Sequence, residues 1–187
     1  MIVNKQSENL ELTLNNDVTI NGNLTLTLGD VNLNGYQLTL GGNSTLIGET
    51  ADNRVHGTSG SITTTRNIDA PNELNVAGLG IVLTSTENFG STTVVRGNTQ
   101  KVFNAGFGIN RYYEIHPANN DDLNATMKFH NFEEELNTNL GTINEGELDL
   151  WRFDGAVWNF QWATVDFANN YITKTNIPQF STWTSGS

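Results

Sequence analysis

The chain has 187 residues, a net charge of −11 and no cysteine. The acidity argues against proteins that bind nucleic acid through clustered Lys and Arg, and against docking on anionic membranes. The absence of cysteine excludes disulfides and thiolate metal sites. The sequence contains no run of about 18 apolar residues, so we expect no membrane span. The 28 Asn, 24 Thr and 18 Gly are the composition of many short strands joined by tight turns, so we expect an all-β fold.

The first third of the chain repeats short alternating strands. Leu10, Leu24 and Leu38 lie 14 residues apart, and a second short strand follows each of the first two runs. Two architectures agree with this pattern. One is a β-solenoid-like stack of coils in which the leucines form a ladder, and the other is a meander of antiparallel hairpins closed by Asn-Gly turns. The in-register leucines favour the coils, whose open ends would need capping by other sequence.

The middle of the chain continues this pattern without a clear linker, and aromatic residues concentrate in the last part. There the regular spacing of strands and turns predicts an antiparallel β-sandwich, with Asp154-Gly155 as a hairpin turn. A turn within 101–110 separates a repeat-containing β region, residues 1–105, from the sandwich, residues 106–187, and the two regions are compatible with one continuous unit. The predicted strands are 9–14, 18–20, 23–28, 31–33, 37–40, 61–65, 73–76, 80–84, 91–96, 112–115, 125–129, 147–152, 157–162, 171–173 and 180–183.

Several motifs spread over almost the whole chain carry a resemblance. They are Asn75-Val76-Ala77-Gly78, Arg111-Tyr112-Tyr113-Glu114-Ile115, Leu123-Asn124-Ala125-Thr126, Asp149-Leu150-Trp151 and Phe180-Ser181. Together they resemble a module repeated in large secreted proteins of Bacteroidetes-type bacteria. In that group the module often lies upstream of a type IX secretion sorting domain or within giant adhesins.

The resemblance implies an extracellular, cell-surface location and a role in attachment or display as part of a longer polypeptide. It implies surface polysaccharide or another cell-surface protein as the partner, with no nucleic acid and no membrane insertion. It implies no catalytic residue.

The sequence offers few candidates for catalysis. The histidines His56, His116 and His130 are isolated, none in a His-Glu-x-x-His spacing, and we expect them in turns or on the surface. Glu147 and Asp149 would share one face of a strand about 7 Å apart, a separation known from glycosidases. An exposed acidic strand face explains that pair more simply, so we expect no enzyme.

A calcium ion is the first ligand considered. Asn119, Asn120, Asp121 and Asp122 supply several oxygens in a loop between two strands, and oxygen ligands are those that Ca²⁺ prefers. The turn at 15–17 is a weaker candidate. An ordinary turn rich in Asn and Asp is the alternative interpretation.

A carbohydrate is the second ligand considered. Trp158, Phe160 and Trp162 alternate, which places them on one face of one strand. The simpler interpretation is that this face lies in the core, because the aromatic side of a half-buried sheet turns inward. If the rings faced water they would form a sugar-binding platform. The alternative function is therefore a carbohydrate-binding accessory module of a secreted enzyme.

Overall fold

The computed structural model describes residues 1–7, 10–104 and 106–187, and within these residues it confirms the all-β class. The helical segments in that part of the chain are short 3-10 turns, η1 (Val76–Gly78), η2 (Glu133–Leu136) and η3 (Glu145–Glu147). The described residues contain no helix of the length and apolarity needed to cross a membrane.

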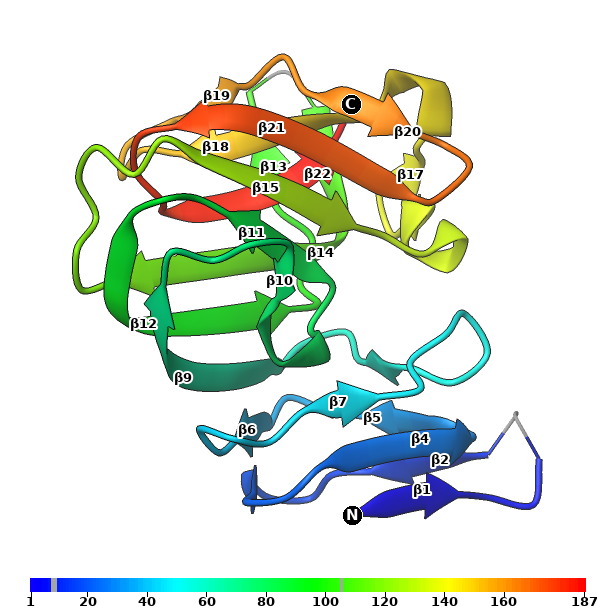
Figure 1. The fold of residues 1–187 in the computed structure, drawn as a ribbon. Helices are drawn as coiled ribbons and strands as arrows, with labels where there is room; N and C mark the ends of the chain where they lie inside the picture. The colour runs from blue at the N-terminus through cyan, green and yellow to red at the C-terminus, as the bar shows by residue number, and fades with distance from the viewer. Residues whose placement is uncertain (8–9, 105) are drawn as a thin grey trace.

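The N-terminal strands form three parallel ladders (Figure 1). We use the word coil for each run of three consecutive strands, one from each ladder. The ladders run β1-β4-β7, β2-β5-β8 and β3-β6-β9. This pairing differs from the antiparallel hairpins of the meander alternative. The strands are β1 (Ile2–Asn4), β2 (Glu11–Thr13), β3 (Val18–Ile20), β4 (Leu24–Leu28), β5 (Asp30–Asn32), β6 (Gln37–Leu40), β7 (Leu46–Ile47), β8 (Val55–His56) and β9 (Ser61–Asp69).

The expected ladder of Leu10, Leu24 and Leu38 is wrong. Leu24 pairs with Leu46 in one ladder. Leu38 pairs with Val18 and Ile62 in another. Side chains that bond one coil to the next join residues 20 to 24 positions apart. The 14-residue spacing therefore links different sides of a coil, because each side begins with a similar alternating run.

Side chains at the coil corners bond the backbone of the following coil. The Asp17 carboxylate accepts a hydrogen bond from the backbone N–H of Gln37 at 2.8 Å, and the Asp30 carboxylate accepts one from the backbone N–H of Arg54 at 2.8 Å. Gly48 turns a corner with φ of 78°, where an added Cβ would collide with a carbonyl oxygen of the coil below. The many Asn and Asp residues thus connect coils as well as shaping local turns.

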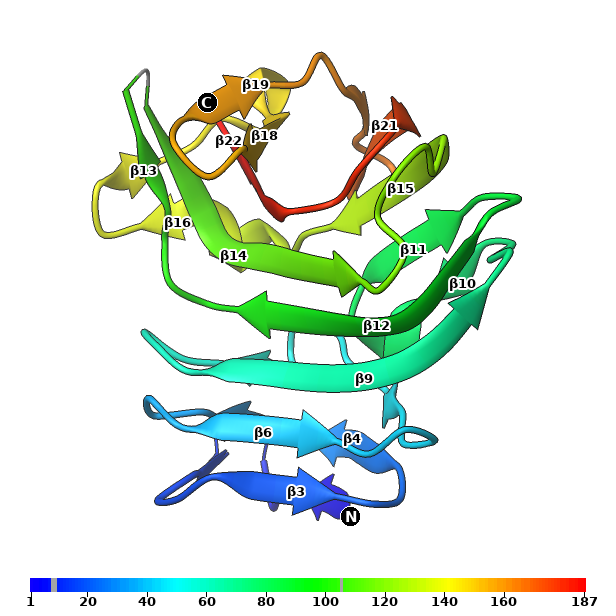
Figure 2. The same cartoon turned by 90° about the vertical axis from the view of Figure 1, so that its left-hand side faces the viewer.

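One sheet of nine strands runs from the coils through the rest of the molecule (Figure 2). Its order is β19-β18-β22-β14-β12-β9-β6-β3, with β13 paired to β14. Pairing changes from parallel to antiparallel at β9, which joins β6 on one side and β12 on the other. The added strands are β12 (Asn88–Gly97), β13 (Val102–Phe103), β14 (Gly106–Pro117), β18 (Asp149–Phe153), β19 (Trp158–Phe160) and β22 (Thr182–Gly186).

A second, antiparallel sheet packs against the antiparallel strands of this one, an arrangement compatible with a β-sandwich. We call the region that carries these strands, from β10 onward, the sandwich. The order of the second sheet is β10-β11-β15-β21-β20. Tyr113 of the long sheet meets Phe129 of the second sheet edge-on, with ring centroids 4.9 Å apart, and both rings are fully buried. Both sheets combine strands from the two sides of 101–110. The remaining strands are β10 (Leu74–Asn75), β11 (Ile81–Thr84), β15 (Ala125–His130), β16 (Asn137–Thr138), β17 (Gly141–Thr142), β20 (Thr164–Asp166) and β21 (Tyr171–Ile177).

Candidate functional site

A row of touching aromatic rings follows the β18–β19 hairpin. Trp151 stacks on Phe103 with centroids 4.1 Å apart and meets Phe160 edge-on at 5.2 Å. Phe160 in turn meets Trp162 edge-on at 4.7 Å. The exposed fraction rises along this row from 9% at Trp151 to 40% at Phe160 and 82% at Trp162. We call this row the aromatic edge; its members are Phe103, Trp151, Phe153, Trp158, Phe160 and Trp162.

The expectation that Trp158, Phe160 and Trp162 share one buried strand face is wrong. Trp158 is half-buried, but Phe160 and Trp162 are exposed. Strand β19 ends at Phe160, and Trp162 follows it with φ of 55°. A bulky residue seldom adopts that left-handed conformation, which breaks the alternation of the strand.

The backbone on both sides of Trp162 is held from two directions. Asp149 is buried and accepts a hydrogen bond from the Ala163 amide at 3.0 Å. Burial raises the pKa of Asp149, although these amide hydrogen bonds oppose the shift. Lys174 donates its Nζ to the Gln161 carbonyl at 2.6 Å. The exposed indole is therefore presented by an ordered loop.

The turn considered for calcium connects β14 to β15 and forms hydrogen bonds with neighbouring segments of the same chain. Asn120 donates to the Phe180 carbonyl at 3.0 Å and accepts from the Phe180 amide at 2.8 Å. Asn119 donates to the Asn88 carbonyl, and Asp121 accepts from Gln179. Among the described residues no group of three or more His, Asp or Glu is arranged to hold a metal ion. Calcium binding at 119–122 stays a prediction, and the same applies to 15–17, where Asp17 already accepts from Gln37.

The three histidines lie in different surroundings. His116 is exposed on β14, and His56 ends β8 with its Nε2 3.3 Å from Glu11 and 3.6 Å from Asp30. His130 differs from the expected surface histidine, because its ring packs between Phe132 and Tyr171. Burial, followed by the nearby charge of Arg111, lowers the pKa of His130 to about 4.

The carboxylates considered for glycoside hydrolysis do not form a pair on one strand. Glu147 ends the 3-10 turn η3 and is exposed, whereas Asp149 begins β18 and is buried against the Ala163 amide. The turn at Glu147 interrupts the strand that the alternation predicted.

Two buried ion pairs lie where the coils meet the sandwich. The Arg96 guanidinium contacts both oxygens of Glu49, at 2.6 and 2.7 Å. Arg111 donates twice to one oxygen of Glu135, at 2.7 and 2.9 Å, and also to the Tyr113 hydroxyl at 3.2 Å. Both arginine side chains are fully buried. Burial raises the pKa of Glu49, but the charge and hydrogen bonds of Arg96 outweigh it and the net shift is downward.

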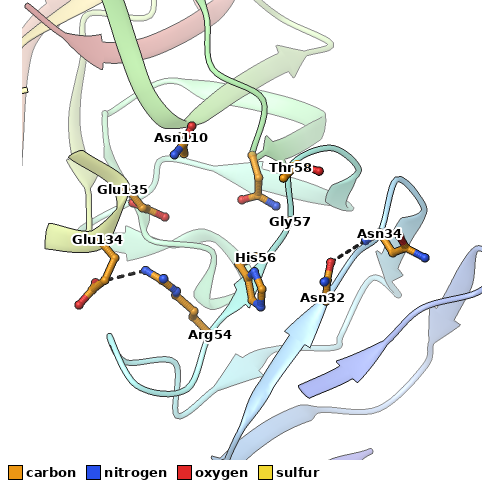
Figure 3. A pocket seen from close by; sticks show the side chains of 10 residues that line it. Asn32, Asn34, Arg54, His56, Gly57, Thr58, Asn110, Glu134 and Glu135 are labelled. Carbon is orange, nitrogen blue, oxygen red and sulfur yellow. Dashed lines mark hydrogen bonds and ion pairs between the residues drawn. The ribbon is translucent and has the colours of Figure 1, made fainter. Parts of the chain in front are cut away.

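A polar hollow of about 270 Å³ opens at the same junction, which we call the junction pocket (Figure 3). The coils contribute β5 and β8, and the sandwich contributes β14 and η2. Arg54 crosses one side of it to Glu134, with 3.2 Å between the guanidinium and the carboxylate. Asn98, which directly follows β12, is 4% exposed and also lines the hollow. Its main polar side chains are Asn32, Arg54, His56, Asn98, Asn110 and Glu134.

Sequence reasoning missed both the buried ion pairs and the junction pocket. Arg96 and Glu49 are 47 residues apart, and Arg111 and Glu135 are 24 apart. No local pattern joins residues at such distances. The one available signal was charge within apolar strands, since Arg96 follows Val94-Val95 and Arg111 precedes Tyr112-Tyr113. An arginine inside a strand of that kind needs a partner when it is buried.

Comparison with models of known protein families, with curated proteins and with solved structures finds no match for this chain.

Proposed function

We propose that the chain is a non-catalytic extracellular module of a bacterial surface protein, acting as an adhesin or as a stalk or display domain. In this proposal the N-terminal region is a short β-solenoid that the sandwich caps at one end. The observation that carries the proposal is the nine-stranded sheet, which crosses from coils to sandwich without interruption. A continuous hydrogen-bonded sheet resists bending between the two regions, as a spacer requires.

Two further features favour attachment over catalysis. The Arg96–Glu49 pair joins the two regions across their junction, and the Arg111–Glu135 pair lies buried beside it. Glu147 and Asp149, the carboxylates with glycosidase spacing in the sequence, lie in different elements, Glu147 exposed in η3 and Asp149 buried in β18. A rigid display role depends on a fixed junction between the two regions and needs no pair of catalytic carboxylates.

Antibody labelling of intact cells that make this protein tests the surface location. We expect an antibody raised against the purified chain to label cells before permeabilisation. An antibody against a cytoplasmic protein is the control and should label only permeabilised cells. Labelling of our chain only after permeabilisation would contradict the proposal.

One observation favours the second candidate, a carbohydrate-binding accessory module of a secreted enzyme. The exposed rings of Phe160, at the end of β19, and Trp162, in the loop that follows, meet edge-on, and exposed apolar patches often mark binding sites. Sugars stack on such rings through their apolar faces.

Retention on insoluble polysaccharides tests this candidate. We expect Trp162→Ala to lose retention while its free energy of unfolding changes by no more than about 0.5 kcal/mol, because the side chain is 82% exposed. Phe167→Ala is the matched control, since Phe167 is also exposed, at 53%, and lies outside the aromatic edge. Equal retention of all three proteins, or none by the parent chain, rules out this candidate.

A further inference from the structure

We propose that the junction pocket binds a single neutral sugar residue. A spacer or display module needs no ligand, so this site goes beyond the proposed function and does not depend on it. It is also separate from the aromatic edge, which lies on β18 and β19. The hollow of about 270 Å³ is near the lower limit of small-ligand pockets, about 300 Å³, and matches one ring rather than an extended chain.

The first argument is a set of buried donors without partners. Nε of Arg54 and Nδ2 of Asn98 are buried and make no hydrogen bond within the described residues. Both residues line the junction pocket, as does His56, whose Nε2 lies 3.3 Å from the Glu11 carboxylate. Buried polar groups in native proteins are almost always hydrogen-bonded, so two such donors at one hollow point to an occupant that supplies acceptors.

Of these donors, Nδ2 of Asn98 is the stronger evidence for an occupant. Its residue is only 4% exposed, so bulk water reaches it little, and its Nδ2 has no partner. A side-chain amide offers both a donor and an acceptor. Two neighbouring hydroxyl groups of a sugar match that pair, because each hydroxyl both accepts and donates.

The charges around the pocket argue for a neutral occupant. Glu134 already pairs with Arg54, and Glu11 and Asp30 lie within 4 Å of His56. The chain as a whole carries −11. A phosphate or carboxylate would meet this negative field, whereas a hydroxyl accepts from the unpartnered nitrogens without adding charge.

The lining also explains why an apolar ligand is a poor match. Asn32, Asn98 and Asn110 bring amides, and Thr58 brings a hydroxyl. These groups come from different elements, and strands β5, β8 and β14 are held in the parallel ladder and the long sheet. Preorganised polar groups lose little entropy on binding, which favours a small polar ligand.

Backbone amide NMR with free sugars tests the proposal. The probes are glucose, galactose, mannose and N-acetylglucosamine, each titrated separately into the ¹⁵N-labelled chain. We expect at least one to shift the amides of Gly57, Thr58, Asn98 and Thr99 in a saturable way, with a Kd in the millimolar range. Asn98→Ala should weaken that Kd about tenfold through the lost hydrogen bond.

Two further variants make the result specific. Arg54→Lys keeps the positive charge and removes Nε, so we expect it to weaken binding as well. Phe167→Ala is the control and should leave the Kd unchanged, since Phe167 is exposed and lies outside both the junction pocket and the aromatic edge. If Asn98→Ala does not fold, as its own spectrum would show, Thr58→Ala takes its place, because Thr58 is exposed and its loss does not disturb the core.

Three results would overturn the proposal. The first is that none of the four sugars shifts these amides, which would leave a hollow filled only by water. The second is that shifts are confined to Asn159–Ala163, which would assign binding to the aromatic edge. The third is that inorganic phosphate shifts the pocket amides at lower concentration than any sugar, which would make the site anionic. The surface-spacer proposal would stand in each case.

Discussion

At the scale of single residues, His130 makes the stability of the fold depend on pH. Its ring lies between Phe132 and Tyr171, and burial together with Arg111 lowers its pKa to about 4. In the unfolded chain this histidine has a pKa near 6.5, so between about pH 6.5 and pH 4 the unfolded state binds a proton at His130 and the folded state does not. The free energy of unfolding is therefore highest, as far as His130 determines it, at neutral pH, and it decreases as the pH drops from about 6.5 to about 4.

We expect urea denaturation to show a loss on the order of 1–2 kcal/mol across that interval, after allowance for the part of the ring that meets solvent. His130→Phe should remove this loss, whereas His116→Gln should not, because His116 is exposed. The pKa of Glu49 is lowered by the charge and hydrogen bonds of Arg96, so its protonation destabilises the fold in a lower pH range. A pH profile of His130→Phe identical to that of the parent chain would refute the assignment.

A calcium titration tests the metal hypothesis, also at the residue scale. A site that binds the ion only in the folded state adds about 2.7 kcal/mol at a hundredfold excess over Kd. A rise of several degrees in Tm from EDTA to millimolar calcium, abolished by Asp121→Ala with Asp122→Ala, would support it. We expect no rise, because Asn120 and Asp121 already bond Phe180 and Gln179.

At the scale of elements, the Arg96–Glu49 pair joins strand β12 to the segment before β8. Removing one member of a buried pair leaves an uncompensated charge, so Arg96→Met should lower the free energy of unfolding by about 3–5 kcal/mol. The double variant Arg96→Met with Glu49→Leu should lose less than the sum of the single losses, since no buried charge remains. Strictly additive losses in urea denaturation would show that the pair does not couple these elements.

At the scale of the whole molecule, strand β9 belongs to both regions, because it pairs with β6 of the coils and β12 of the sandwich. We therefore expect one cooperative unfolding transition. The four Trp residues, 151, 158, 162 and 183, all lie in the sandwich, so Trp fluorescence reports that region, whereas far-UV circular dichroism reports all strands. The two midpoints should coincide. A dichroism loss at lower temperature than the fluorescence change would mean that the coils unfold separately.

Local sequence patterns placed most of the strands. The runs 18–20 and 37–40 were predicted with the bounds that the structure has, and 23–28 was predicted one residue longer than β4, because alternation and the flanking Asn and Gly act within a few residues. Asp154-Gly155 was predicted as a hairpin turn, and β18 pairs with β19 across it. Alternation also failed locally where a turn interrupted a strand, at Glu147 and after Phe160.

The sequence alone determined the all-β class, the turn-rich composition and the position of most strands, since all of these depend on neighbouring residues. Only the tertiary structure decided which strands pair. An alternating run specifies the face that is buried and not the partner, so Leu38 pairs with Val18 rather than with Leu24. The same reason applies to the candidate sites. The exposure of Trp162, the burial of Arg96 and the position of Asn98 and Arg54 around one hollow depend on chain segments distant in sequence, which local physics does not bring together.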